Sequence, residues 1–332
     1  MAQRLLVSDL SEGQILSRIL PILPQGKYAI LGSGDDCAVV QSPGGRFAVT
    51  TDVLVENVHF RRDWSNPDEI GMRAAVQNLS DVNAMGAHTT ALVVSLVLPP
   101  DLEIDWLERF AGGLAAVVAP TGAGIVGGDL SRGEGLVISV TAHGKLSNSP
   151  ITRSGARPGD TLAVVGNLGY SAAGLAALSS GAVSGSLHGA DVPVPYRRAV
   201  ALYRCPEAPL EAGPLAASRG ATAMLDISDG LVEDGIRMAE ASDVTLDLTR
   251  NALASRVEEL SEVGNELGVD PLEWVLYGGE DHGLLVAFPP YVLVTAPFTA
   301  IGTIGERKFA RSELVTLDRV PLEQRGFDHF RS

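Results

Sequence analysis

Aspartates in this chain follow short apolar runs and are flanked by glycine, serine or threonine. Carboxylates gathered at strand ends repel one another, so a cation has to offset their charge. Carboxylate, hydroxyl and carbonyl oxygens suit Mg²⁺ far better than zinc or copper. The pattern therefore predicts a site for several Mg²⁺ ions, which typically hold a polyphosphate. The motifs are G-S-G-D-D at 32–36, T-T-D at 50–52, N-L-S-D at 78–81, G-G-D at 127–129, D-I-S-D-G at 226–230 and G-G-E-D at 278–281.

The first two motifs flank two apolar runs, 37–40 and 46–51. Gly44-Gly45 between the runs predicts a hairpin turn. An Asp pair at a turn, such as the one that includes Asp36, usually bonds its own backbone. A hairpin would bring the T-T-D oxygens beside Asp36, which favours the metal interpretation over the turn.

Two further aspartates have a simple structural alternative. Asp81 lies in 68–85, whose apolar spacing predicts a helix, and it could face solvent there. Its polar neighbours on a small, apolar helix favour a site instead. Asp129 follows a short predicted strand, 124–128, that ends in two glycines. Glycine there allows close approach of a ligand, but a tight turn explains it equally well.

The D-I-S-D-G motif joins a predicted strand, 223–227, to a predicted helix, 231–242. Ser228 or Asp229 could cap that helix. Asp226 ends the strand, where no cap is needed, and a helix N-terminus favours phosphate. Both features indicate a phosphate and metal site.

Composition excludes several classes of function. The formal net charge of −15 over 332 residues argues against binding to nucleic acid or anionic membranes. Two cysteines cannot form a cysteine-rich zinc site. The P-loop, Rossmann and H-E-x-x-H motifs are missing from the sequence. With no signal peptide visible in the first ten residues and no membrane-length apolar run, we expect a cytoplasmic protein.

Strands and helices mix in both halves, which predicts an α/β or α+β protein. The length favours two domains. The polar, turn-rich segment 152–160 is the best candidate for the boundary, giving domains at 1–150 and 151–332.

The motifs, taken together and in order, resemble those of the thiamine-monophosphate kinase family, in the aminoimidazole-ribonucleotide-synthetase-like superfamily. The resemblance runs from about Ser11 to Phe330. It includes G-S-G-D-D-C-A, T-T-D-V-L-V-E-N-V-H-F, N-L-S-D-V-N-A-M-G-A, G-G-D-L-S-R-G, T-R-S-G-A-R-P-G-D, D-I-S-D-G-L, Y-G-G-E-D-H-G-L and G-F-D-H-F. His282 departs from the family, in which an aromatic residue often follows G-G-E-D, and this concerns the wall of the thiamine pocket.

The resemblance implies direct, in-line transfer of the γ-phosphoryl group of ATP to thiamine monophosphate, with no catalytic base or covalent residue. It implies a homodimer whose N-terminal sheets pair into a barrel, and a C-terminal α/β sandwich. It implies Mg²⁺ ligands at Asp36, Thr50, Thr51, Asp52, Asp81, Asp129, Asp226 and Asp229. It implies ATP contacts at Gly128, Arg153 and Ser228, and thiamine contacts at His59, Glu280 and Phe327.

Other functions stay open at this point. Another ATP-dependent enzyme of the superfamily, of the purine-synthesis type, matches G-G-E-D and G-F-D-H-F less well. A Mg²⁺-dependent phosphohydrolase would use water as the acceptor. A nucleotide sensor would bind ATP without turnover. If neither residue belongs to a functional site, Arg153 is an ordinary linker charge and His59 is a histidine packed in the structure.

Overall fold

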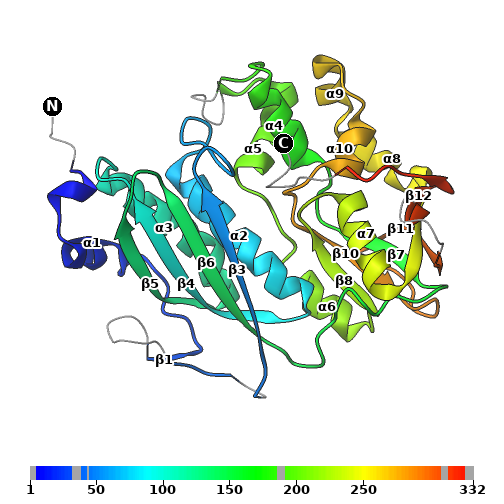
Figure 1. Ribbon diagram of the computed structural model, residues 1–332, viewed down its shortest axis with the longest axis horizontal. Coiled ribbons are helices and arrows are strands. Elements are labelled where there is room, and N and C mark those ends of the chain that lie inside the picture. The colour runs from blue at the N-terminus through cyan, green and yellow to red at the C-terminus, as the bar shows by residue number, and fades with distance from the viewer. Residues whose placement is uncertain (1–4, 32–38, 43–44, 185–190, 308–312, 326–332) are drawn as a thin grey trace. The chain divides into compact units, whose positions relative to one another are not determined.

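The computed structural model describes residues 5–31, 39–42, 45–184, 191–307 and 313–325 (Figure 1). Asp36 and Phe327, two of the expected site residues, lie outside this part. The chain divides into two compact units. The first consists of Met1–Val82 and Ala87–Ser147, and the second of Asn83–Gly86 and Asn148–Ser332.

A four-stranded sheet forms the centre of the first unit, in the order β3-β6-β4-β5. β4 pairs parallel with β5, and the two other pairings are antiparallel. A parallel pair needs a crossover, which α3 (Ile104–Val118) provides. The strands are β3 (Phe47–Val55), β4 (His88–Leu98), β5 (Gly124–Arg132) and β6 (Val137–Lys145).

Helices α2 (Pro67–Ala84) and α3 cover one face of this sheet (Figure 1). Their backbones meet closely at two glycines. A Cβ on Gly71 would lie 2.2 Å from the carbonyl oxygen of Phe110, and one on Gly113 would lie 2.1 Å from that of Asp68. A larger residue at either position would push α2, the helix that carries Asp81, away from α3.

The start of the chain adds short elements to this unit. A helix begins after Ser11, whose hydroxyl accepts from the N–H of Gln14. The predicted hairpin between 37–40 and 46–51 is wrong, because β2 pairs with β1 and β3 pairs with β6. No hairpin therefore brings Asp36 to the T-T-D motif among the pairings of the described strands. The elements are η1 (Val7–Asp9), α1 (Glu12–Ile19), β1 (Ala29–Leu31), β2 (Val39–Val40) and η2 (Ala119–Thr121).

The second unit is built on a seven-stranded sheet, in the order β13-β12-β9-β11-β7-β10-β8. Only the β9–β12 pairing is parallel among the pairs described. β10 lies between β7 and β8 and is buried at every position. The strands are β7 (Thr161–Val165), β8 (Ala223–Ile227), β9 (Val244–Leu248), β10 (Gly283–Phe288), β11 (Thr299–Glu306), β12 (Val315–Leu317) and β13 (Val320–Pro321).

Helices pack against this sheet, and α7 contacts β8, β9 and β12. An edge-to-face pair of Phe288 and Phe298, with ring centroids 5.2 Å apart, lies in the core. The mixed α/β architecture expected from the sequence is confirmed. The helical elements are α4 (Tyr170–Ser179), η4 (Val194–Tyr196), α5 (Arg197–Arg204), α6 (Ala212–Ser218), α7 (Leu231–Ser242), α8 (Arg250–Glu259), α9 (Ser261–Leu267) and α10 (Pro271–Tyr277).

Among the described residues, every helix is too short or too polar to cross a membrane.

Candidate active site

In the first unit, the T-T-D motif lies within β3 and faces α2 through two of its three side chains. Side chains alternate along a strand, so Thr50 and Asp52 share one face of the sheet. The hydroxyl of Thr50 donates to Asp81 Oδ2 at 2.6 Å. Both groups are partly buried. The structure thus joins two of the expected metal-binding motifs directly.

Thr51 points to the opposite face. Its hydroxyl donates to the carbonyl oxygen of Val140 and accepts from the hydroxyl of Thr141, each at 3.0 Å. The expected convergence of the whole T-T-D motif therefore does not extend to the Thr51 hydroxyl. The alternation of a strand explains the difference, since adjacent residues cannot share a face.

Gly128 and Asp129 lie inside β5, which continues beyond the predicted strand end to Arg132. Asp129 is exposed and accepts from the hydroxyl of Ser131 at 3.0 Å. A Cβ on Gly128 would lie 1.9 Å from the carbonyl oxygen of Val94, so the site requires glycine.

Gly128 also borders a cavity of about 450 Å³ on the first unit, lined in part by Phe47, Thr90 and His143. Burial lowers the pKa of His143, so this imidazole is neutral at pH 7. The cavity wall is therefore mainly apolar and uncharged beside the glycine pair.

His59 follows β3 and has a defined tautomer. The backbone N–H of Val55 donates to His59 Nδ1 at 2.9 Å. A nitrogen that accepts this bond carries no proton, so the neutral ring carries its proton on Nε2. The donor of this ring is therefore Nε2–H.

In the second unit, Asp226 is the last but one residue of β8, and Ser228 and Asp229 follow in a turn before α7. Asp226 is 8% exposed. The turn is held from the helix, because Asp234 Oδ2 accepts the N–H groups of Ser228 and Asp229 at 3.0 and 2.9 Å. Neither Ser228 nor Asp229 caps α7, whose N-cap is Gly230 with a φ of 111°.

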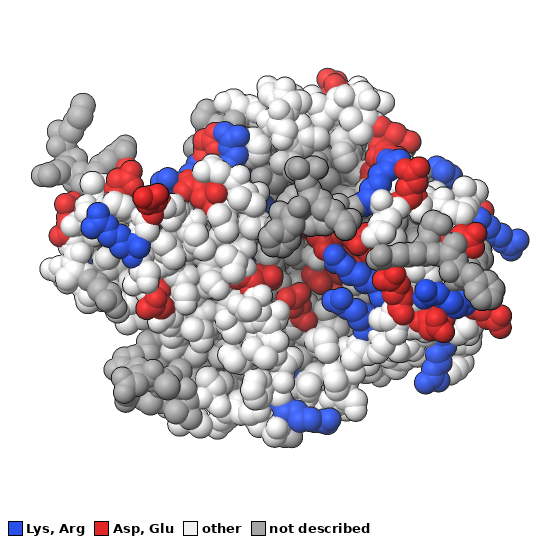
Figure 2. Space-filling model, in the orientation of Figure 1, with Lys and Arg blue, Asp and Glu red and all other residues white. Residues whose placement is uncertain are grey.

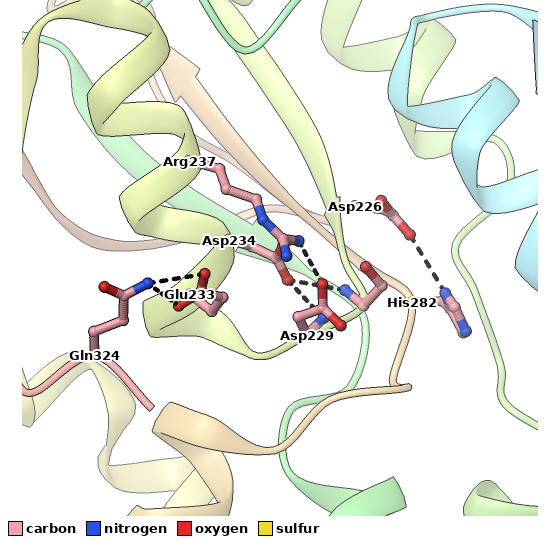
Figure 3. A network of polar contacts seen from close by, with 8 residues as sticks. Asp226, Asp229, Glu233, Asp234, Arg237, His282 and Gln324 are labelled. Atoms are coloured by element: carbon pink, nitrogen blue, oxygen red, sulfur yellow. Dashed lines mark hydrogen bonds and ion pairs between the residues drawn. The ribbon is translucent and has the colours of Figure 1, made fainter. Parts of the chain in front are cut away.

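Arg237 links two of these carboxylates (Figure 3). Its Nη1 lies 2.5 Å from Asp229 Oδ2 and 2.7 Å from Asp234 Oδ1. Burial raises the pKa of Asp234 to about 7, although the backbone N–H bonds and Arg237 act in the opposite direction. Sequence reasoning missed both residues because their place within an amphipathic helix is typical of an ordinary packed or solvated position.

The G-G-E-D motif forms a turn bonded to the end of β8. The N–H of Glu280 donates to the carbonyl oxygen of Ser228 at 2.7 Å, and that of His282 donates to Ile227 at 3.0 Å. Asp281 is fully buried, and its carboxylate accepts the N–H groups of Gly169 and Ser171 at 2.5 and 2.9 Å. Burial raises the pKa of Asp281 to about 6, partly offset by these two bonds.

His282 lies against Asp226. Its Nδ1 is 3.3 Å from Asp226 Oδ2, and the side chain is 1% exposed. His282 thus contacts an expected metal ligand directly, and its effect on the wall of the thiamine pocket stays a prediction. The signal in the sequence was the departure itself, an ionisable ring after G-G-E-D.

Arg153 stands apart from this network. Its side chain is exposed, and its carbonyl oxygen accepts from the hydroxyl of Ser242 at 2.6 Å. On the face drawn in Figure 2, basic side chains of the described residues stand beside acidic ones. An exposed guanidinium is free to approach an anion in solution.

Within the described ranges, no three His, Cys, Asp or Glu side chains lie close enough to hold one metal ion. The oxygen types nevertheless fit Mg²⁺. Asp81 and Asp226 are each restrained through one carboxylate oxygen, by Thr50 and by His282. Hard carboxylate oxygens of this kind are the donors that Mg²⁺ prefers.

Comparisons with known proteins agree with the fold. The family model for the N-terminal domain of AIR synthase related proteins matches residues 34–146, and that for the C-terminal domain matches 157–295. A thiamine-monophosphate kinase from Mycobacterium tuberculosis is 42% identical over 85% of this chain and 82% of its own length. One from Corynebacterium glutamicum is 40% identical over 94% and 91%.

A solved structure, AaThiL complexed with AMPPCP and TMP, superposes with a TM-score of 0.78. It is 33% identical and covers 89% of this chain and 91% of its own. Identity at this level over nearly the whole length, together with both domain matches, shows that the chain belongs to the thiamine-monophosphate kinase family of AIR synthase related proteins.

Proposed function

We propose that this chain transfers the γ-phosphoryl group of ATP to the phosphate of thiamine monophosphate, which yields thiamine diphosphate. The observation that carries the proposal is the likeness to AaThiL complexed with AMPPCP and TMP, an ATP analogue and a phosphorylated acceptor. We propose that residues 1–150 and 151–332 act as the two domains of this enzyme.

Both substrates carry phosphate, so nucleophile and electrophile repel each other. Bound Mg²⁺ would supply the positive charge that offsets this repulsion. The acidic side chains of the chain cannot do so by themselves. The residues proposed to hold the ions are Asp36, Asp52, Asp81, Asp129, Asp226 and Asp229, with oxygens of Thr50 and Thr51.

The hydrogen bonds of these residues define how they act. Thr50 fixes one oxygen of Asp81, and Asp234 fixes the turn at Ser228 and Asp229. Such restraint lowers the entropy lost when a ligand is bound. The backbone at Gly128, the exposed guanidinium of Arg153 and the turn at Ser228 are proposed to bind the nucleotide.

The thiamine side is proposed to use His59, Glu280 and Phe327. The His59 tautomer supports a donor role through Nε2–H. Glu280 has a φ of 66° and is only partly buried, so its carboxylate is accessible to a cationic ligand. The acceptor phosphate is ionised at neutral pH, so direct in-line transfer needs no general base and no covalent intermediate.

We propose that the enzyme is a homodimer in which first units pair through β3. This strand lies at the edge of its sheet and exposes apolar side chains at alternate positions. Phe47, Val49 and Val53 are 56%, 58% and 44% exposed. Light scattering on Val49→Asp tests the pairing, and an unchanged dimer mass would contradict it.

The deciding assay combines purified protein, ATP, Mg²⁺ and thiamine monophosphate, and detects thiamine diphosphate. Formation of thiamine diphosphate that requires all three additions supports the kinase. Steady ATP hydrolysis without thiamine monophosphate would instead indicate a phosphohydrolase. Tight nucleotide binding without turnover would indicate a sensor.

A further inference from the structure

We propose that His282 is a positioning residue that orients the Asp226 carboxylate for cation binding. The inference rests on the proposed function, since it takes Asp226 as a Mg²⁺ ligand. It concerns the histidine that follows G-G-E-D, because a phenylalanine or tyrosine ring has no nitrogen at this position.

The contact is between two side chains shielded from water. His282 Nδ1 lies 3.3 Å from Asp226 Oδ2, with side-chain exposures of 1% and 11% (Figure 3). An ionised carboxylate only accepts hydrogen bonds, so Nδ1 must carry a proton and donate it. The bond therefore holds one oxygen of Asp226 and leaves Oδ1 for another partner.

The backbone fixes the imidazole where it can donate. His282 has a φ of 53° and Glu280 a φ of 66°, a left-handed conformation that side chains rarely adopt. The N–H of His282 donates to the carbonyl oxygen of Ile227, the residue after Asp226. The next residues continue as β10, with Gly283 opposite Ile227 and Leu284 opposite Asp226. Donor and acceptor thus belong to adjacent strands in fixed register.

The neighbouring carboxylate is restrained in a different way. Asp229 Oδ2 contacts the guanidinium of Arg237 at 2.5 Å, so a full positive charge already lies beside the Asp229 carboxylate. The Asp226 carboxylate is instead restrained by a hydrogen bond from an imidazole ring through Nδ1. Of these two aspartates, Asp226 is therefore the one that is oriented by a buried ring contact rather than by a guanidinium. Hydrogen bonds to ligating carboxylates typically change metal affinity about 10–100-fold when removed.

The experiment measures binding without turnover. Equilibrium dialysis of the full-length protein with AMPPCP gives the Mg²⁺ concentration at half-maximal nucleotide binding. His282→Phe keeps an aromatic ring but removes the donor, and we expect the midpoint to rise about tenfold. His282→Asn keeps an N–H near the position of Nδ1, and asparagine tolerates the left-handed backbone. We expect its midpoint to stay within about threefold of the parent value.

A double-mutant cycle separates positioning from general damage. In the Asp226→Asn background, His282→Phe should have almost no further effect on the midpoint. An equal effect in both backgrounds, an unchanged midpoint in His282→Phe, or a loss in His282→Asn as large as in His282→Phe would each overturn the inference. If Asp226→Asn itself leaves the midpoint unchanged, the Mg²⁺ role assigned to Asp226 in the proposed function fails instead.

Discussion

Thr50 and Asp81 join strand β3 to helix α2 through a hydrogen bond of 2.6 Å between Oγ1 and Oδ2. The residues belong to different sequence motifs, T-T-D and N-L-S-D, that the fold of the first unit brings together. A hydroxyl that donates to one oxygen sets the plane of the carboxylate and directs the other oxygen away from Thr50. The Asp81 carboxylate is therefore restrained by Thr50 in the absence of a ligand.

Removal of this hydroxyl should reduce activity more than stability. We expect Thr50→Val to lower kcat at sub-saturating Mg²⁺ by about 10-fold or more, because an unrestrained Asp81 binds the cation less well. The lost hydrogen bond should lower the free energy of unfolding by only about 0.5–1.5 kcal/mol. Steady-state kinetics over a Mg²⁺ series and urea denaturation measure the two effects. Thr50→Ser, which keeps the hydroxyl, is the matched control, and equal losses in both variants would contradict the prediction.

A second prediction concerns Arg237, which faces both Asp229 and Asp234. The pKa of Asp234 is raised to about 7, above its value in the unfolded chain, so the folded state binds the extra proton between about pH 4 and 7. Stability from this group falls as pH rises through that window. Arg237 lowers this pKa, so Arg237→Met should raise it further and extend the fall above pH 7. A rise of one in the pKa corresponds to about 1.4 kcal/mol.

The variant should therefore be more destabilised at pH 8.5 than at pH 6, as measured by urea denaturation in EDTA. Arg237→Lys retains the charge and should show a smaller difference between the two pH values. The same loss at both pH values in Arg237→Met would show that Asp234 does not titrate in this range.

Local pattern predicted much of the fold. The apolar spacing of 68–85 matches α2, and the strand-to-helix reading around Asp226 matches β8 and α7. Strand partners were harder to predict, because an apolar run does not specify its partner. β3 pairs with β6 rather than with the nearby segment before it. A Gly-Gly turn signal favoured the short-range pairing, and tertiary packing overrode it.

The candidate site was predictable as motifs rather than as contacts. Thr50 and Asp81 were named separately, and only the fold shows their hydrogen bond. The opposite direction of Thr51 follows from strand alternation once the strand is known to run through the motif. Asp234 and Arg237 act on the backbone and side chains of the site from positions that local spacing makes ordinary, so no sequence signal distinguished them.

A third prediction uses the tautomer of His59. Because Nδ1 accepts the N–H of Val55, only Nε2–H can donate to a substrate. His59→Gln can place an amide N–H near the Nε2 position, whereas His59→Leu cannot donate. We expect His59→Leu to raise the KM for thiamine monophosphate about tenfold, which corresponds to one lost hydrogen bond of about 1.4 kcal/mol. His59→Gln should retain part of the affinity.

The KM for ATP serves as the internal control for His59 and should change little in either variant. A rise in both KM values, together with a lower melting temperature, would indicate that His59 only packs the turn after β3. That outcome would remove His59 from the proposed thiamine contacts.

The last prediction concerns Asp281, whose two oxygens each accept one backbone N–H, from Gly169 and from Ser171. Asparagine can accept only one of these bonds, and its NH₂ group would face the other N–H. Asp281→Asn should therefore lower the free energy of unfolding by roughly 2–3 kcal/mol at neutral pH.

The pKa of Asp281 is raised to about 6, so the folded protein binds its proton between about pH 4 and 6 and the unfolded chain does not. Stability contributed by the carboxyl group falls as pH rises through this range, and the variant lacks that dependence. The difference in unfolding free energy between parent and variant should accordingly be larger near pH 4 than above pH 6. Urea denaturation at several pH values measures it, and a difference that grows with rising pH would show that the buried carboxyl is ionised throughout.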